Sequence, residues 1–173
     1  MDEIKVVING VKYRVVPDEV ENVKDDERAK TGYERVKKTE IYYFIGMTGD
    51  VDFDNEADHP IDCSRYEIAN YYSDETTAEN NARADKLICR LRQWQALNDE
   101  PVDWMNDKKR KWGITYDYSR SLIISCGACD YRNFTDIYFS TKEKAEEAIE
   151  VFKDDLIWYF TEYISRLDEP RIG

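Results

Sequence analysis

The sequence predicts an α+β protein: an antiparallel sheet of about five or more short strands with three helices packed on one face, plus an N-terminal β-hairpin. Three observations support this class. Short aromatic and β-branched runs are joined by turn residues, and other stretches carry apolar side chains three and four residues apart. In addition, the segments NYYSDETTAENNARA (70–84) and IYFSTKEKAEEAIEV (137–151) each read as an aromatic strand end followed by a capped helix.

The length and composition indicate one globular domain. The chain has 173 residues, of which 42% are hydrophobic, and it contains only 7 Gly and 4 Pro. A chain of this length can bury roughly 70% of its unfolded surface, which is enough for a core. We expect a single domain over 1–173, made of an N-terminal hairpin (1–16), a charged linker or short helix (17–32) and an α+β core (33–167).

The first predicted elements are two hairpins. Residues 4–16, IKVVINGVKYRVV, place Asn-Gly between two β-branched runs, and both central residues of a tight hairpin turn need positive φ. A second hairpin is expected from a strand at 41–45, through a turn at 46–49, to a return strand that contains Val51 and Phe53. We expect a loop to follow through 59–60.

The next predicted element is a long helix. Ser73 or Asp74 can cap its first turn, because a side-chain oxygen there accepts hydrogen bonds from the free N–H groups. The helix is expected to run to about Asn98 and must end before Pro101. Its apolar stripe consists of Ala78, Ala82, Leu87, Ile88, Leu91, Trp94 and Leu97.

Strands and two more helices complete the predicted core. GITYDYSRSLIISC indicates two short strands around a turn at 118–121, and FTDIYF indicates a third strand that ends at Phe139. Ser140 and Glu143 form a capping-box pattern for a helix that contains Ala145, Ala148, Ile149 and Phe152. A last helix is expected at about 154–167. Because both junctions combine an aromatic strand end, a Ser-containing cap and an Ala-Glu pair, we interpret them as the same crossing from sheet to helix, with duplication of half the chain as a bolder hypothesis.

Four strings together resemble a family of uncharacterised small proteins carried by bacteriophages and prophages of Gram-positive bacteria: YYFIGMTGDV, RYEIANYYSDETTAE, DWMNDKKRKWGITYDY and IYFSTKEKAEEAI. The resemblance covers about residues 36–160 and depends on the order of the motifs. The sequence differs from the family pattern at Ala69, where glycine is usual, and at Tyr72, where phenylalanine is usual. The resemblance implies a mobile-element origin and an accessory role, and it assigns no catalytic residues.

Net charge and hydropathy narrow the class of partner. The formal charge of −12 argues against broad nucleic-acid binding, which needs a basic surface, and favours basic partners. No run of about 18 apolar residues occurs, and the start MDEIKVVING is acidic where a signal peptide would be basic and then apolar. We expect a cytoplasmic protein of a bacterial host cell that has no membrane partner.

Cysteine and histidine spacing offers a metal or redox hypothesis. Cys126 and Cys129 in CGAC could hold one zinc ion, with Cys63 and His59 completing a tetrahedron. A second close-spaced cysteine pair is missing, and a thioredoxin-like pair would open a helix rather than lie between two strands. We therefore expect no cofactor and no metal, and keep a small zinc-binding or redox protein that uses Cys126 and Cys129 as an alternative. Because no secretion signal is visible, we also expect no structural disulfide. The acidic run DVDFDNEAD lacks the spacing of an EF-hand loop.

A basic and aromatic run is the candidate interaction surface. Four cations beside an aromatic side chain could grip a phosphate backbone and stack a base, although a solvated basic turn explains the pattern equally well. The residues of this candidate surface are Trp104, Lys108, Lys109, Arg110, Lys111 and Trp112.

The functional hypothesis is a non-enzymatic protein-binding module that acts on a host or phage protein. No catalytic constellation is visible, and the chain is acidic and rich in Tyr and Trp, the aromatic residues that dominate interface energetics. A sharper version is an acidic inhibitor of a host defence system that mimics the charge of nucleic acid. The alternative is a single-stranded nucleic-acid-binding accessory protein.

Overall fold

The computed structural model describes residues 4–8, 11–15, 30–128, 132 and 137–168. The chain divides into two units, one comprising Met1–Ala29 with Arg171–Gly173 and the other Lys30–Pro170. In the first unit, β1 (Ile4–Ile8) pairs antiparallel with β2 (Val11–Val15), which confirms the predicted N-terminal hairpin. Most of the predicted linker lies outside the described residues.

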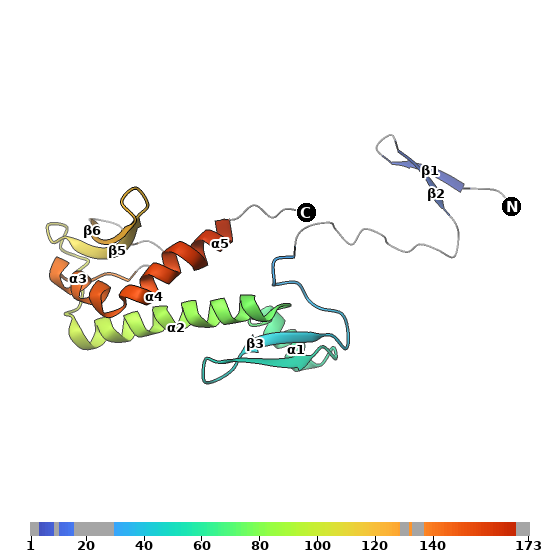
Figure 1. Ribbon diagram of the computed structural model, residues 1–173, viewed down its shortest axis with the longest axis horizontal. Helices are drawn as coiled ribbons and strands as arrows, with labels where there is room; N and C mark the ends of the chain where they lie inside the picture. The colour runs from blue at the N-terminus through green and yellow to red at the C-terminus, as the bar shows by residue number, and fades with distance from the viewer. Residues whose placement is uncertain (1–3, 9–10, 16–29, 129–131, 133–136, 169–173) are drawn as a thin grey trace. The chain divides into compact units, whose positions relative to one another are not determined.

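The second unit is arranged around the long helix α2 (Glu75–Asn98) (Figure 1). The hairpin of β3 (Ile41–Ile45) and β4 (Val51–Asn55), together with α1 (Pro60–Glu67), lies near the first turns of α2. The hairpin of β5 (Lys111–Asp117) and β6 (Leu122–Ala128), together with α3 (Lys142–Val151), lies near its last turns.

The chain then returns along α2 through three consecutive helical segments. These are α4 (Lys153–Trp158), the π-helix η1 (Tyr159–Tyr163) and α5 (Ile164–Asp168). Asp155 forms an ion pair with Arg90, and Tyr163 donates a hydrogen bond to Asn81, so the two helical stretches run antiparallel. The predicted last helix is confirmed, but its π-helical turn was not foreseen. None of the helices in the described residues has the length and apolar character to cross a membrane.

The α+β class is confirmed, but the prediction of one sheet with five or more strands is wrong. The described residues of the second unit form two separate two-stranded sheets, with orders β3–β4 and β5–β6. The expected third strand at the end of FTDIYF is reduced to an isolated bridge between Phe139 and Trp112, and residues 133–136 lie outside the described range. The local pattern identified the strands of the three hairpins correctly, but it carried no information on which strand edges meet.

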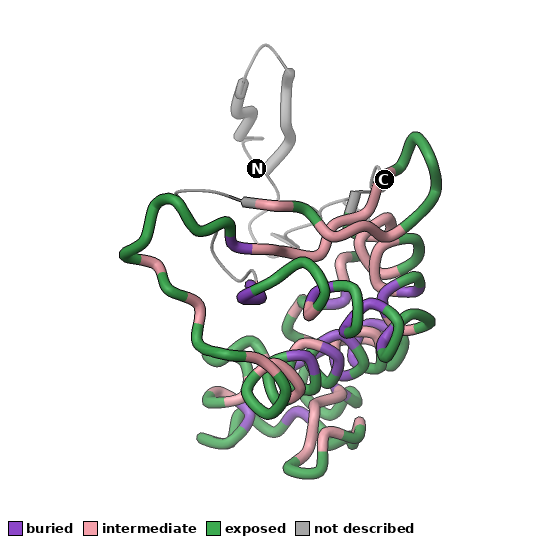
Figure 2. The backbone as a smooth tube through the Cα atoms, turned by 90° about the vertical axis from the view of Figure 1, so that its left-hand side faces the viewer, coloured by how far each residue is buried: buried purple, intermediate pink, exposed green. Residues whose placement is uncertain are grey.

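The core forms where α2, α3 and α4 meet the inner face of the β5–β6 hairpin. Its buried residues are Leu87, Leu91, Phe139, Ala145, Ala148, Ile149, Phe152 and Leu156. Figure 2 shows that buried residues gather along the helices, whereas the connecting loops are largely exposed. Burying each large side chain of this set contributes about 1.5–3 kcal/mol, so this cluster holds α3 and the hairpin in place.

One helix was missed by the sequence analysis. His59 and Pro60 were expected in a loop, but Pro60 is the first residue of α1 and His59 is its N-cap. The Nδ1 atom of His59 accepts a hydrogen bond from the N–H of Ile61, and Asp62 accepts one from the N–H of His59 at 2.9 Å. An eight-residue helix is too short to show an apolar stripe, although Pro at the first helical position and an acid in the first turn are start signals.

The two predicted helix caps have different outcomes. Asp74 is confirmed as the N-cap of α2, with its carboxylate accepting from the N–H of Thr77 at 2.8 Å. For α3 the predicted capping box is wrong by one residue, because Thr141 is the N-cap and accepts from the N–H of Lys144. The hydroxyl of Ser140 instead donates to Asp99, which joins the start of α3 to the end of α2.

Candidate functional site

The pairing of β5 determines which edge of its hairpin is open. The N–H of Trp112 donates to the C=O of Phe139 at 3.1 Å, and the N–H of Phe139 donates back at 2.7 Å. In an antiparallel ladder, two residues that lie opposite each other point their backbone N–H and C=O groups either toward each other or away from each other. The groups of Trp112 point toward Phe139 and thus away from β6. Trp112 and Gly127 are therefore a non-hydrogen-bonded pair, and the backbone groups of Gly127 point away from β5.

The same alternation applies along the whole of β6. Ser125 lies opposite Ile114, and Ile123 lies opposite Tyr116, each two residues further along the ladder. Their N–H and C=O groups therefore also point away from β5. Within the described part of the chain β6 pairs with β5 alone, so these groups form an open strand edge.

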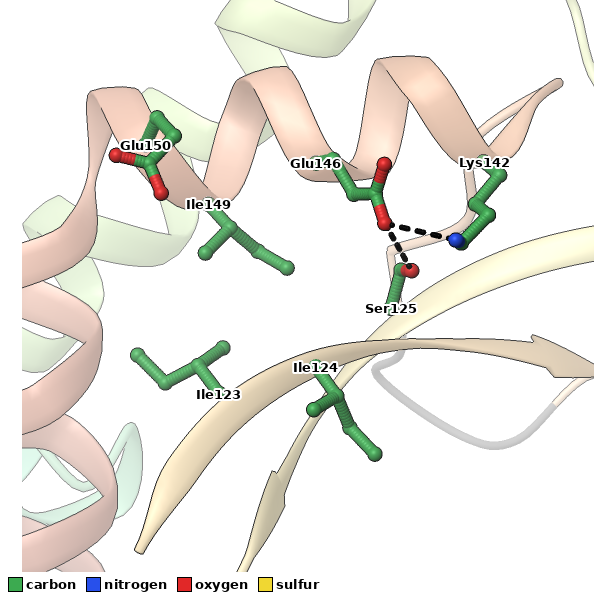
Figure 3. A pocket seen from close by; sticks show the side chains of 7 residues that line it. All are labelled: Ile123, Ile124, Ser125, Lys142, Glu146, Ile149 and Glu150. Atoms are coloured by element: carbon green, nitrogen blue, oxygen red, sulfur yellow. Dashed lines mark hydrogen bonds and ion pairs between the residues drawn. The ribbon is translucent and has the colours of Figure 1, made fainter.

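A pocket of about 570 Å³ lies between β6 and α3. Its lining residues are Ile123, Ile124, Ser125, Lys142, Glu146, Ile149 and Glu150. Figure 3 shows the side chains of Ile123 and Ile149 directed toward one another across the pocket, while Ile124 points away from α3. The pocket thus has an apolar part that borders the open edge of β6.

The polar part of the pocket is a short chain of contacts across it (Figure 3). The Glu146 carboxylate lies 3.1 Å from the Lys142 ammonium and accepts a hydrogen bond from the Ser125 hydroxyl at 3.3 Å. One turn further along α3, Glu150 has its ion-pair partner Lys153 at 3.9 Å. Two carboxylates and one ammonium therefore line the pocket.

The β3–β4 hairpin has an equivalent outer edge, but there side chains bind the backbone N–H groups. Tyr43 and Tyr72 exchange both of their backbone hydrogen bonds, so the backbone groups of Phe53, opposite Tyr43, point to the outer edge of β4. There the N–H of Phe53 is bound by the carboxylate of Asp52 at 2.9 Å, and the N–H of Asn55 by the carboxylate of Asp54 at 2.9 Å. The β4 edge is thus capped by its own side chains, whereas no side chain in the described residues caps the β6 edge.

A buried carboxylate lies behind the β3–β4 hairpin. Glu56 is 2% exposed and receives two hydrogen bonds from the Arg35 guanidinium, both at 2.9 Å, and one from the Tyr71 hydroxyl at 2.8 Å. The hydrogen bonds from Arg35, which outweigh the effect of burial, lower the pKa of Glu56 to about 2. Glu56 therefore stays ionised at neutral pH and acts as a structural anchor.

A second buried carboxylate joins the same hairpin to α1. Asp62 is 2% exposed and accepts from the Tyr42 hydroxyl at 2.8 Å and from the backbone N–H groups of Ala57 and His59. Burial would raise the pKa of Asp62, but these hydrogen bonds prevail and lower it. Arg65 donates to the Tyr42 oxygen from the other side. This cluster holds fixed charges, which is unsuited to proton transfer at neutral pH.

The six residues of the basic and aromatic candidate surface do not share one face. Lys111 is only 2% exposed, with its ammonium 2.6 Å from the carbonyl oxygen of Asn106, and Trp112 packs against the core. Trp104 is half-buried, with its ring edge-on to Tyr138 at 5.0 Å. Only the remaining three cations are exposed: Lys108, Lys109 and Arg110.

The predicted zinc ligands are only partly described. Cys63 and Cys126 are free thiols, and Cys129 lies outside the described residues. Cys63 accepts a hydrogen bond from Arg35 at 3.5 Å, and His59 caps α1. Over the residues that the structure describes, no three His, Cys, Asp or Glu side chains are grouped to hold a metal ion.

Comparisons with models of known protein families, with curated proteins and with solved structures find no match to this chain. The pocket beside β6 was missed by the sequence analysis. The repeated junction in the sequence is the signal that could have indicated this site. At each junction an aromatic residue, Tyr72 or Phe139, pairs with the first strand of a hairpin, and this pairing leaves the second strand of that hairpin at the sheet edge.

Proposed function

We propose that this chain is a non-enzymatic protein-binding module that accepts an extended segment of a host or phage protein as an added strand beside β6. The observation that carries this proposal is the open edge of β6 next to the pocket under α3. The edge offers backbone donors and acceptors that have no partner among the described residues, and the pocket offers a place for side chains of the added strand.

The physical basis is strand addition at an exposed sheet edge. In this mode main-chain hydrogen bonds provide affinity, and pockets that receive alternate side chains provide specificity. Ile123, Ser125 and Gly127 present their backbone groups outward, and each hydrogen bond formed contributes about 0.5–1.5 kcal/mol net. The apolar contact over Ile123 and Ile149 adds to this stabilisation.

The contrast between the two hairpins supports a role for β6. Proteins commonly protect exposed strand edges with charged side chains that prevent unwanted pairing. Asp52 and Asp54 provide this protection on β4, and in the part of the chain that the structure describes no side chain provides it on β6. An unprotected strand edge beside a pocket is typical of a surface that binds an added strand.

Mimicry of nucleic-acid charge has less support than binding at the β6 edge as the way in which a defence inhibitor would act. Exposed carboxylates occur on β4, α2, α3 and α4, and two of those on α3, Glu146 and Glu147, are paired with lysines of the same helix. Such interspersed charges do not resemble the regular negative array of nucleic acid. An inhibitor of a host defence system would, in this proposal, act through the β6 edge.

The nucleic-acid alternative has less support. It needs an exposed aromatic ring beside the cations to stack a base. Trp112 packs against the core, and Lys111 is buried. The three exposed cations at 108–110 therefore have near them an aromatic ring that is partly buried against the core.

The test is selection of short random peptides on the whole protein, followed by NMR mapping of the selected peptides. We expect the largest amide shifts at Ile123, Ser125 and Gly127, and at the facing turns of α3. Selection of no peptide, or shifts confined to other elements, would overturn the proposal.

A matched pair of proline variants sharpens the test. Ser125→Pro removes one outward N–H but no bond to β5, and proline is tolerated at edge positions of this kind. Phe53→Pro removes the equivalent outward N–H on β4 and serves as the control. We expect Ser125→Pro to lose peptide binding and Phe53→Pro to keep it, with folding of both checked by urea denaturation. Equal binding by both variants would contradict strand addition at β6.

A further inference from the structure

The geometry of the pocket points to the chemistry of the added strand. Resting on the proposed function, we infer that the partner segment carries a Lys or Arg two residues from an aliphatic residue, and that Glu146 and Glu150 select the cation. The aliphatic side chain lies over Ile123 and Ile149.

Spacing on the two elements supports this pattern. Side chains on one face of a strand recur every two residues, or about 6.6–6.8 Å. On β6, Ile123 and Ser125 are also two residues apart: the side chain of Ile123 faces Ile149, and the hydroxyl of Ser125 donates to Glu146 (Figure 3). An added strand beside β6 therefore presents two successive side chains toward α3 at the spacing that separates this apolar contact from this acidic contact.

Charge in the pocket favours a cation. Two carboxylates line it against the single ammonium of Lys142. The Glu150 side chain is 73% exposed and its ion pair with Lys153 is long, at 3.9 Å, so an incoming cation can compete with Lys153 for this carboxylate. The whole chain carries −12, which further favours the approach of a basic segment.

Ser125 links cation selection to strand pairing. Its backbone groups belong to the open edge, and its hydroxyl donates to Glu146 at 3.3 Å. A strand that pairs beside Ser125 therefore brings its side chain close to this carboxylate. A partner cation there competes with Lys142, whereas a partner carboxylate would be repelled by both Glu146 and Glu150.

The experiment uses a designed peptide with blocked ends, Thr-Lys-Thr-Val-Thr-Lys-Thr, in which Lys, Val and Lys share one face of a strand. Three control peptides replace both Lys by Gln, both Lys by Glu, or Val by Ser. Binding to the full chain is measured by NMR titration at low and high salt. We expect the Lys peptide to bind about two- to thirtyfold more tightly than the Gln peptide, the range that two exposed ion pairs provide. We expect the Glu peptide to bind least and added salt to reduce these differences.

Charge reversal in the protein is the decisive variant. Glu146→Lys with Glu150→Lys is expected to reverse the order, so that the Glu peptide binds more tightly than the Lys peptide. Glu143→Lys with Glu147→Lys changes the net charge equally on the same helix, at residues that do not line the pocket, and is the control. An unchanged order in the pocket variant, or the same reversal in the control, would overturn the assignment of the cation to Glu146 and Glu150.

The two proposals fail in different ways. If the Lys, Gln and Glu peptides bind equally and Ser125→Pro abolishes all binding, the cation inference is wrong and strand addition stands. If the Lys peptide binds with the expected charge order but Ser125→Pro has no effect, strand addition is wrong. Loss of affinity for the Ser peptide alone would support only the apolar contact and contradict cation selection.

Discussion

Phe139 exchanges both of its backbone hydrogen bonds with Trp112, just as Tyr72 does with Tyr43. In each case an aromatic residue pairs with the first strand of a hairpin and is followed within three residues by the first turn of a helix. This shared pairing is the structural content of the repeated junction in the sequence. It also leaves the second strand of each hairpin, β4 or β6, at the sheet edge.

Phe139→Ala is predicted to destabilise the protein strongly. Phe139 is 0% exposed and lies in the core, so its truncation leaves a cavity that costs about 3–5 kcal/mol. Phe53→Ala removes the same side chain at a position that is 62% exposed and should cost no more than about 0.5 kcal/mol. Urea denaturation measures both changes, and equal losses of the free energy of unfolding would contradict the placement of Phe139 in the core.

Glu56→Gln is predicted to destabilise the β3–β4 region. The substitution leaves the Arg35 guanidinium without its buried anionic partner, which costs about 2–4 kcal/mol because Arg35 is itself only partly buried. Asp58→Asn, at a side chain that is 63% exposed and also contacts Arg35, is the control and should cost less than about 0.5 kcal/mol. Urea denaturation compares the two variants. A loss for Glu56→Gln no larger than that of the control would contradict the structural role of this carboxylate.

Acid is predicted to destabilise the fold between about pH 5 and pH 2. Arg35 lowers the pKa of Glu56 to about 2. Burial would raise the pKa of Glu34, but its hydrogen bonds from Thr31 and Gly32 prevail and lower it to about 2. A carboxyl group with a lowered pKa in the folded state contributes stability above its unfolded value of 4.5, and that contribution is lost as pH falls toward the folded value. The free energy of unfolding against pH should fall in this window and should fall less steeply in Glu56→Gln, while equal slopes would contradict the assignment.

Removing the caps of β4 is predicted to promote self-association. Asp52→Ala with Asp54→Ala frees the N–H groups of Phe53 and Asn55 and takes two charges from the edge, which leaves a strand able to pair with a second copy. Asp50→Ala removes a neighbouring charge whose carboxylate instead contacts Thr48, and it is the control. Light scattering over a concentration series measures the mass. A variant that stays at the mass of the parent protein at every concentration would contradict the capping role.

Sequence reasoning succeeded where structure depends on neighbouring residues. The hairpins, the cap at Asp74 and the helix that ends at Asn98 all follow from turn chemistry, side-chain capping and apolar spacing over short stretches. It failed where distant segments meet. The single sheet was wrong because a strand pattern states which residues are extended but not which edges pair. The predicted basic surface was wrong in part, because no local pattern in the sequence indicates that the side chain of Lys111 is buried while that of Lys108 is exposed.

The amino-acid order alone therefore determined the class of fold, the acidic character and the two matched crossings from strand to helix, because each of these depends on composition or on contacts a few residues apart. The tertiary structure decided that the edge of β4 is closed by Asp52 and Asp54, and that β6 borders a pocket under α3. Both outcomes depend on which side of a strand carries its free N–H groups. That side was set by Tyr72 and Phe139, each of which lies more than twenty residues along the chain from the strand residue it pairs with.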